Sequence, residues 1–182
     1  MIIALAGRRI DAADETEPRF PLANRAAVQA RIRDRFVTLN VSALVSSAAC
    51  GADLLAQAVA RELGGRTVVV LPIASTAFRI RSVTDRPGAW GALFDTVIAD
   101  AQQRGDLYVL NSSDKEVASG AAYAQTNDAI LDRALALGAS ATEMVRAITV
   151  WDGRQRRNDD MTAQFRESAI GRGIEVEDLA TR

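Results

Sequence analysis

Short apolar runs alternate along the chain with longer amphipathic segments. The run TVVVLP at residues 67–72 is β-branched and stops at a proline, as strands often do. Continuous apolarity is typical of strands buried on both faces, as in a parallel sheet. We predict strands at residues 2–6, 41–46, 67–72, 106–110, 146–151 and 174–179. The last run alternates apolar residues with Glu175 and Glu177, which favours a strand at the sheet edge.

Between these runs, apolar residues recur every three or four positions, the spacing of one helix face. Val28, Ile32 and Phe36 are one example, and a second stripe on the predicted helix 51–64 consists of Ala52, Leu55, Ala56, Val59 and Leu63. Residues 73–88 and 111–120 contain many turn-forming residues and are predicted to be irregular. The predicted helices are residues 23–39, 51–64, 89–104, 121–138 and 161–172.

The alternation of strands and helices predicts the fold class. Such a chain forms right-handed crossovers, which place helices on both faces of a parallel sheet. We therefore predict an α/β protein with a single Rossmann-like, doubly wound, three-layer domain over residues 1–182. Its sheet should be mainly parallel, with five to six strands.

Composition narrows the choice of partners. The net charge of -1 is too close to neutral for a dedicated nucleic-acid binder. No apolar run approaches the length of a membrane span. The single cysteine, Cys50, excludes an intrachain disulfide framework. We expect a cytoplasmic protein with no membrane partner and no strong nucleic-acid partner.

The chain contains no histidine. This absence excludes a Ser-His-Asp triad, a Cys-His dyad and a metal site built from histidines. Acid–base chemistry would have to use Asp, Glu, Tyr, Lys or the lone cysteine. We predict neither a cofactor nor a metal.

Ligands of doubly wound sheets bind beyond the carboxyl ends of the strands, near the point where the strand order reverses. The predicted strands place five loops at that edge: residues 7–9, 46–53, 72–81, 111–120 and 152–162. Candidate binding residues are therefore sought in these loops.

The second of these loops contains an unusual number of small side chains, SSAACGA at residues 46–52. Two explanations remain open. Small residues let a helix and a strand pack closely; alternatively, a helix that begins near Gly51 points the free N–H groups that precede Leu54 at a bound anion. In the second case Arg8 converges on the same hollow. Neither GxGxxG nor a Walker loop is present.

Several single side chains carry alternative interpretations. Arg8 and Arg9 directly follow the first strand, where each would hold an anion or remain solvated. Arg79 and Arg81 would share one face of an extended loop, with simple surface charge as the alternative. Cys50 adjoins a helix N-terminus, which activates some thiols, but without a histidine a small buried thiol is favoured.

Trp151 and Asp152 end the fifth predicted strand. Trp151 would flank a ligand ring or belong to the core. Asp152 is the candidate general acid or base, and its alternative role is to stabilise the turn at Asp152-Gly153.

Four segments, ALAGRR, SSAACGADLLA, VVVLP and ITVWDG, together resemble the SLOG superfamily. This group joins the lonely-guy phosphoribohydrolases, the Smf/DprA DNA-processing proteins and sensor domains of nucleotide signalling. The resemblance extends from about residue 2 to residue 178 and implies a ligand that is a nucleotide or is derived from one. The positions that it implicates are Gly7, Arg8, Gly51, Ala52, Asp53, Pro72, Tyr123, Asn127, Trp151, Asp152, Gly153 and Thr162. Arg9, Ser47 and Arg79 complete the candidate ligand-binding set.

The chain departs from the family pattern after Gly153. The family has a glycine-rich phosphate loop there, whereas Asp159, Asp160 and Met161 replace those glycines. Thr162 matches the family threonine, and Phe165 stands where the resemblance implies a catalytic glutamate. Acidic side chains in this loop would repel a phosphate.

Three functional hypotheses follow. The first is a binding or sensor domain for a nucleotide or a nucleotide-derived small molecule. Its possible protein partners are a second copy of the chain, in a homodimer, and an effector protein. The second is an N-glycosidic hydrolase or transferase that uses Asp152 or Asp160. The third is a structural dimer without a ligand. The lost glycine loop and glutamate favour the first.

Overall fold

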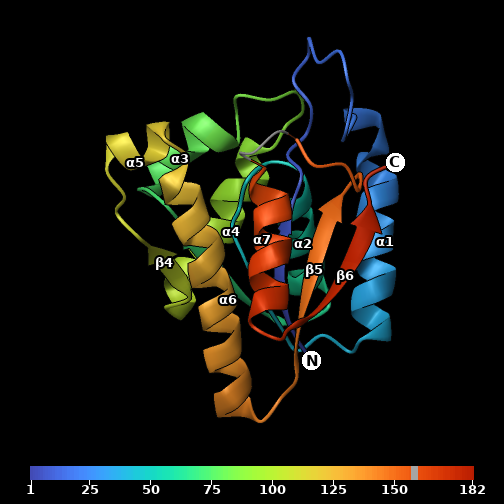
Figure 1. Cartoon of the computed structure of the whole chain (residues 1–182), viewed down its shortest axis with the longest axis vertical. Helices are drawn as coiled ribbons and strands as arrows, with labels where there is room; N and C mark the ends of the chain where they lie inside the picture. Colours follow the sequence, from blue (N-terminus) through green and yellow to red (C-terminus); the bar gives the residue numbers. More distant parts are fainter. Residues whose placement is uncertain (157–159) are drawn as a thin grey trace.

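The computed structural model describes residues 1–156 and 160–182, and shows a parallel sheet between two layers of helices (Figure 1). The strand order is β4-β3-β2-β1-β5-β6, and every neighbouring pair is parallel. The strands are β1 (Ile2–Gly7), β2 (Ala43–Ser46), β3 (Arg66–Leu71), β4 (Leu107–Val109), β5 (Val145–Trp151) and β6 (Glu175–Ala180). The predicted α/β class, the sheet and the edge position of the last strand are confirmed.

The strand order reverses at β1. This strand pairs with β2 on one side and with β5 on the other, where Ile2 lies opposite Val145 and Gly7 opposite Val150. The chain therefore leaves the carboxyl ends of β1 and β5 in different directions. Such a switch point is where doubly wound sheets bind their ligands.

Helices cover both faces of the sheet, as Figure 1 shows with α6 and α7 in front. The helices are η1 (Leu22–Asn24), α1 (Arg25–Thr38), α2 (Ala52–Glu62), α3 (Ser75–Ser82), α4 (Gly91–Arg104), α5 (Asp114–Ala118), α6 (Ala121–Ala141) and α7 (Met161–Gly171). In the part of the chain that the structure describes, no helix combines the length and the apolarity needed to cross a membrane.

Two apolar cores result from the alternation of side chains along each strand. In β1, Ile3 and Leu5 face the core beneath α1, α2 and α4, whereas Ile2 and Ala4 face the core beneath α6 and α7. This arrangement fixes the end of β1 between the two helical layers.

Three predictions about the elements are corrected. Residues 75–82 form α3 and residues 114–118 form α5, where irregular loops were expected. The α5 segment is polar but is stabilised by a capping box between Ser113 and Glu116. Helix α2 is buried all round instead of along one stripe, and Leu63, expected on its inner face, is 38% exposed.

Candidate functional site

A cleft of about 350 Å³ lies at the carboxyl end of β1. Its walls come from the loops after β1 and β2, from α3 and α6, and from the start of α7. Eight of the candidate ligand-binding residues line it: Gly7, Arg8, Arg9, Ser47, Asp53, Tyr123, Asn127 and Thr162. The topology thus brings together residues that are far apart in the sequence.

The small residues at the second loop serve close packing within the protein. Gly51 has φ +102, and a Cβ there would lie 2.7 Å from the Arg8 carbonyl oxygen and 2.8 Å from the Ile10 nitrogen. Arg9 and Gly51 form an isolated antiparallel bridge. A Cβ at Gly7 would lie 2.4 Å from Cβ of Ala52. The backbone that approaches Gly51 is therefore the loop after β1.

The same loop occupies the amino end of α2. The Ala52 amide donates to the Arg8 carbonyl at 3.1 Å, and the Leu54 amide donates to the Ala49 carbonyl at 3.2 Å. The expectation of a free amide is therefore wrong for Ala52, because the loop after β1 supplies its acceptor, and the next turn of the helix end is bonded within the protein as well.

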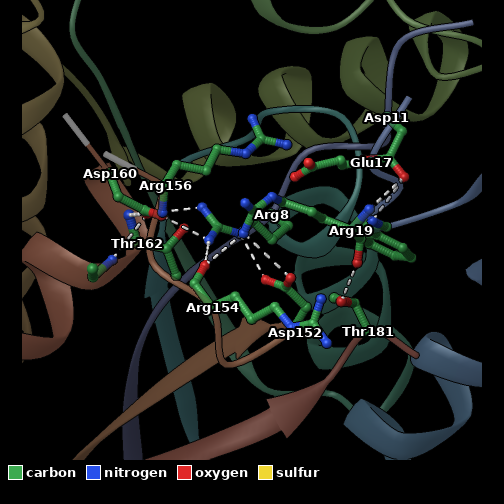
Figure 2. A network of polar contacts seen from close by, with 12 residues as sticks. Arg8, Asp11, Glu17, Arg19, Asp152, Arg154, Arg156, Asp160, Thr162 and Thr181 are labelled. Atoms are coloured by element: carbon green, nitrogen blue, oxygen red, sulfur yellow. Dashed lines mark hydrogen bonds and ion pairs between the residues drawn. The ribbon is translucent and has the colours of Figure 1, made fainter. Parts of the chain in front are cut away.

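Arg8 lies at the centre of a buried polar network (Figure 2). Its guanidinium donates twice to Asp160, at 2.7 Å each, once to the Arg154 carbonyl at 2.6 Å, and once to Asp152 at 3.4 Å. The guanidinium also lies 5.6 Å from the ring centre of Trp151. Arg8 is only 6% exposed, and four of its five N–H groups donate to internal acceptors.

Asp160 acts as the anion of this network. Its carboxylate caps α7 by accepting from the amides of Thr162 and Ala163, and it also accepts from the Arg156 amide at 2.6 Å. Burial raises the pKa of Asp160, but the bonds from Arg8 and the amides outweigh burial and hold the pKa below its usual value. A ligand phosphate at the start of α7 would have to displace this carboxylate. The other acidic residue predicted in this loop, Asp159, lies outside the described residues.

Asp152, the candidate catalytic residue, does not line the cleft. Its side chain is 1% exposed and lies between Arg8 and Arg19. Arg19 is fixed in turn by Asp11, which accepts from its backbone amide at 2.9 Å, and by Thr181, whose hydroxyl donates to its carbonyl (Figure 2). Asp152 borders a second hollow of about 370 Å³ with mostly charged walls, which offers little apolar surface for a base or a ring.

Arg9 and Arg86 present positive charge on the cleft wall. Arg9 pairs with Asp85, and its guanidinium donates to the Cys50 sulfur at 3.7 Å. Burial lowers the pKa of Arg9, and the bonds to Asp85 and Cys50 more than reverse this effect. The Nε atoms of both Arg9 and Arg86 are buried and have no hydrogen-bond partner among the described residues.

Cys50 is a buried thiol. Burial raises its pKa, and the charge of Arg9 offsets only part of this effect. The favoured interpretation of an inert packed thiol agrees with these surroundings, because the thiolate is the reactive form.

Asp53 differs from Asp160, the other carboxylate on the cleft lining, because one of its oxygens makes no hydrogen bond among the described residues. Its Oδ2 accepts from the Ala49 amide at 3.4 Å, whereas Oδ1 has no hydrogen-bond partner in the described part of the chain. Burial raises the pKa of Asp53 to about 7, against weaker lowering by the amides of Ala49 and Gly7 and by Arg9. This carboxyl group is therefore poised to change its charge near neutral pH.

The remaining candidates lie in different places. Gly51, Ala52, Pro72, Trp151 and Gly153 are absent from the cleft lining. Arg79 is also absent: it lies on helix α3 and pairs with Asp95 at 2.8 Å. The prediction that Arg79 and Arg81 share a face of an extended loop is wrong, because residues two apart on a helix point in different directions.

Three candidate residues on α6 and α7 line the cleft. Asn127 donates to the Met161 carbonyl at 2.8 Å, which ties the start of α7 to α6. Tyr123 lies one turn before Asn127 on α6, and Thr162 follows Met161. This wall therefore presents a phenol, an amide and a hydroxyl.

Sequence reasoning missed several lining residues, among them Phe78, Ser82, Arg86 and Arg156. Phe78 and Ser82 lie four residues apart on α3, but only Phe78 is apolar, so the pair gives no apolar helical period in the sequence. Arg156 carried no signal, because nothing in its local sequence separates it from neighbouring arginines.

No known protein family matches this chain, and no curated protein matches it. Within residues 1–156 and 160–182, no group of three or more Cys, Asp or Glu side chains is arranged to hold a metal ion. The site is interpreted below from its own geometry.

Proposed function

We propose that this protein is a binding or sensor domain for a nucleotide or a nucleotide-derived small molecule, held in the cleft at the end of β1. The observation that carries the proposal is a cleft whose wall residues Arg9, Arg86 and Asp53 each have one buried side-chain atom that makes no hydrogen bond among the described residues: the Nε donors of the two arginines and the Oδ1 acceptor of Asp53. Buried polar groups normally find partners, so a polar ligand is the natural complement.

The size and place of the cleft support this proposal. Its volume of about 350 Å³ falls within the usual range for small-molecule sites, about 300–1,000 Å³. It lies where the strand order reverses, as ligand sites of doubly wound sheets do. Apolar contact is available from Leu5, Ile10 and Phe78, against which a base can pack.

The anionic part of the ligand would face Arg9 and Arg86. Arg8, the residue expected to take this role, is occupied by Asp152 and Asp160. Arg9 and Arg86 both pair with Asp85, and their side chains are 26–29% exposed. An arginine fork binds phosphate in a fixed geometry. The resemblance of the sequence to the SLOG superfamily supports the same ligand class.

A thermal-shift series tests this proposal. AMP, cyclic AMP, cyclic and linear oligoadenylates and ADP-ribose are added to the wild type and to Arg9→Gln and Arg86→Gln. A ligand at about 100 times its Kd stabilises a protein by ~2.7 kcal/mol, which is a rise of roughly 5–10 °C for a chain of this size.

The control for this series is Arg104→Gln, because Arg104 is exposed and lies outside the cleft. The rise should persist in Arg104→Gln and shrink in the two cleft variants. If no nucleotide raises the Tm of the wild type, the proposed function is refuted.

An N-glycosidic hydrolase or transferase is a second candidate, and one observation favours it. The cleft contains a buried carboxyl group, Asp53, with a pKa of about 7, which suits general acid–base catalysis at neutral pH. Asp53 would take the role first assigned to Asp152. Chromatography would show free adenine released from AMP by the wild type, and no release by Asp53→Asn. Binding without release would favour the sensor domain.

A further inference from the structure

One buried carboxylate oxygen on the cleft wall is left for a ligand. Asp53 is 7% exposed and lines the cleft. Its Oδ2 accepts from the Ala49 amide, and its Oδ1 makes no hydrogen bond within the described residues, although the Gly7 amide lies near enough to the carboxylate to lower its pKa. A buried acceptor without a donor is costly, so a ligand that supplies one donor to Oδ1 gains free energy here.

The surroundings of Asp53 restrict the kind of donor. Arg9 lies close enough to Asp53 to affect its ionisation, so a cationic amine would meet a like charge. A phosphate placed directly on Asp53 would meet the carboxylate. A neutral hydroxyl or amide-type N–H can donate to Asp53 without bringing a positive charge close to Arg9 or a negative charge close to the carboxylate.

The positions of Arg9 and Arg86 indicate which neutral donor of a nucleotide would reach Asp53. If the ligand phosphate faces Arg9 and Arg86, as proposed above, the group bonded to that phosphate lies next to it, at Asp53. In a nucleotide this group is the sugar, and the base lies farther away. Oδ1 is the one Asp53 oxygen that makes no hydrogen bond within the described residues, so it is the acceptor available to a sugar hydroxyl once the ligand enters the cleft.

We propose that Asp53 selects the ligand by accepting a hydrogen bond from one ribose hydroxyl of a nucleotide, so that the site discriminates ribonucleotides from one of the two deoxy forms. This inference depends on the proposed function. Asp53 is then a specificity-determining residue.

Ligand binding should also release protons. A donor on Oδ1 stabilises the carboxylate form, and with a pKa of about 7 roughly half of the free protein carries the proton at pH 7. Binding therefore releases about half a proton at pH 7, and affinity rises as the pH increases through 7. The charged and titratable groups that share the cleft with Asp53 or adjoin it are Arg8, Arg9, Cys50, Asp85, Arg86, Tyr123, Arg156 and Asp160.

The test is isothermal titration calorimetry with AMP, 2′-deoxy-AMP and 3′-deoxy-AMP, in two buffers of different ionisation enthalpy at pH 7. The variant is Asp53→Asn, whose amide oxygen can replace Oδ2 towards Ala49 and whose NH₂ group then meets the ligand hydroxyl as a neutral donor in place of the carboxylate acceptor. The control is Asp132→Asn, which removes the same charge at an exposed site outside the cleft.

For the wild type and Asp132→Asn, we expect one deoxy analogue to bind about 10–150-fold more weakly than AMP, the range of a hydrogen bond to a charged group. In Asp53→Asn the proton release should disappear, and the preference should shrink to about 2–13-fold, the range of a hydrogen bond between neutral groups. Protons exchanged by the AMP phosphate contribute equally in the wild type and in Asp53→Asn, so they cancel when the two proton releases are subtracted.

The possible results separate the two proposals. If AMP and both deoxy analogues bind wild type and Asp53→Asn equally, the nucleotide site stands and the role of Asp53 is overturned. Proton uptake on binding would also overturn it, because it would mean that protonated Asp53 donates to the phosphate. Loss of affinity on removal of the adenine amino group instead of a hydroxyl would overturn it as well. If no nucleotide of the earlier series binds, both proposals fail.

Discussion

Asp53→Asn should stabilise the free protein at alkaline pH, although it alters a buried polar residue. The pKa of Asp53 is raised from 3.8 to about 7 by burial. A raised acid pKa means that the folded state prefers the protonated group, so its contribution to stability is greatest at low pH and falls as pH rises from 3.8 to 7. Above pH 7 the ionised carboxylate remains in the fold at a cost.

The magnitude follows from the two pKa values. At 1.36 kcal/mol per unit, a rise of about three units corresponds to roughly 4 kcal/mol in full. About two of those units lie above pH 5, so the wild type should lose roughly 3 kcal/mol from this residue between pH 5 and pH 8. For a chain of this length that loss lowers Tm by roughly 6–12 °C. Asn cannot ionise and avoids it.

The measurement is urea unfolding and calorimetric Tm for the wild type, Asp53→Asn and Asp132→Asn at pH 5, 6, 7 and 8. Because the chain has no histidine, few other groups have ordinary pKa values between 5 and 7.5. The advantage of Asp53→Asn should grow with pH, and Asp132→Asn should follow the wild type. Parallel curves for the wild type and Asp53→Asn would refute the reasoning, because Asp53 would then ionise without cost.

Three further changes test other parts of the structure. Arg8→Ala should destabilise the protein by about 3–5 kcal/mol in urea unfolding, since Asp160 would remain buried without its cation; a loss below about 1 kcal/mol would contradict the role of the network. Gly7→Ala should cost more than 1 kcal/mol because its Cβ would overlap its neighbours, whereas Gly171→Ala, in open space on α7, should stabilise by about 0.4–1 kcal/mol; similar effects of the two substitutions would argue against the packing at β1. Cys50 should react with a thiol reagent only in denaturant, and fast labelling of the native protein would contradict its burial.

The fold could be predicted because each buried strand is a local apolar run. The segment TVVVLP needs no distant information to be recognised as a strand, and it forms β3 one residue from the predicted bounds. Helix α5 was missed because only two residues, Ser113 and Glu116, fix its start and its side chains are polar. Helix α3 was missed because Phe78 and Ser82 are its only buried residues.

The site was harder to predict because its chemistry depends on distant pairs. Arg8 follows a strand end as a free cation would, but its partners Asp152 and Asp160 lie 144 and 152 residues later. The unusual state of Asp53 likewise depends on the loop after β1 closing over α2. The local sequence places these residues at the correct edge of the sheet. It does not reveal which of them already have hydrogen-bond or ion-pair partners within the protein.

The central place of β1 has a consequence for synthesis of the chain. Ile2 pairs with Val145, so the first strand to leave the ribosome waits for most of the chain before its second neighbour exists. Until then one side of an apolar strand has unpaired backbone groups, a known route to misassembly. Nascent chains halted before β5 should therefore recruit chaperones. The chaperones should dissociate when residues 145–151 emerge from the ribosome.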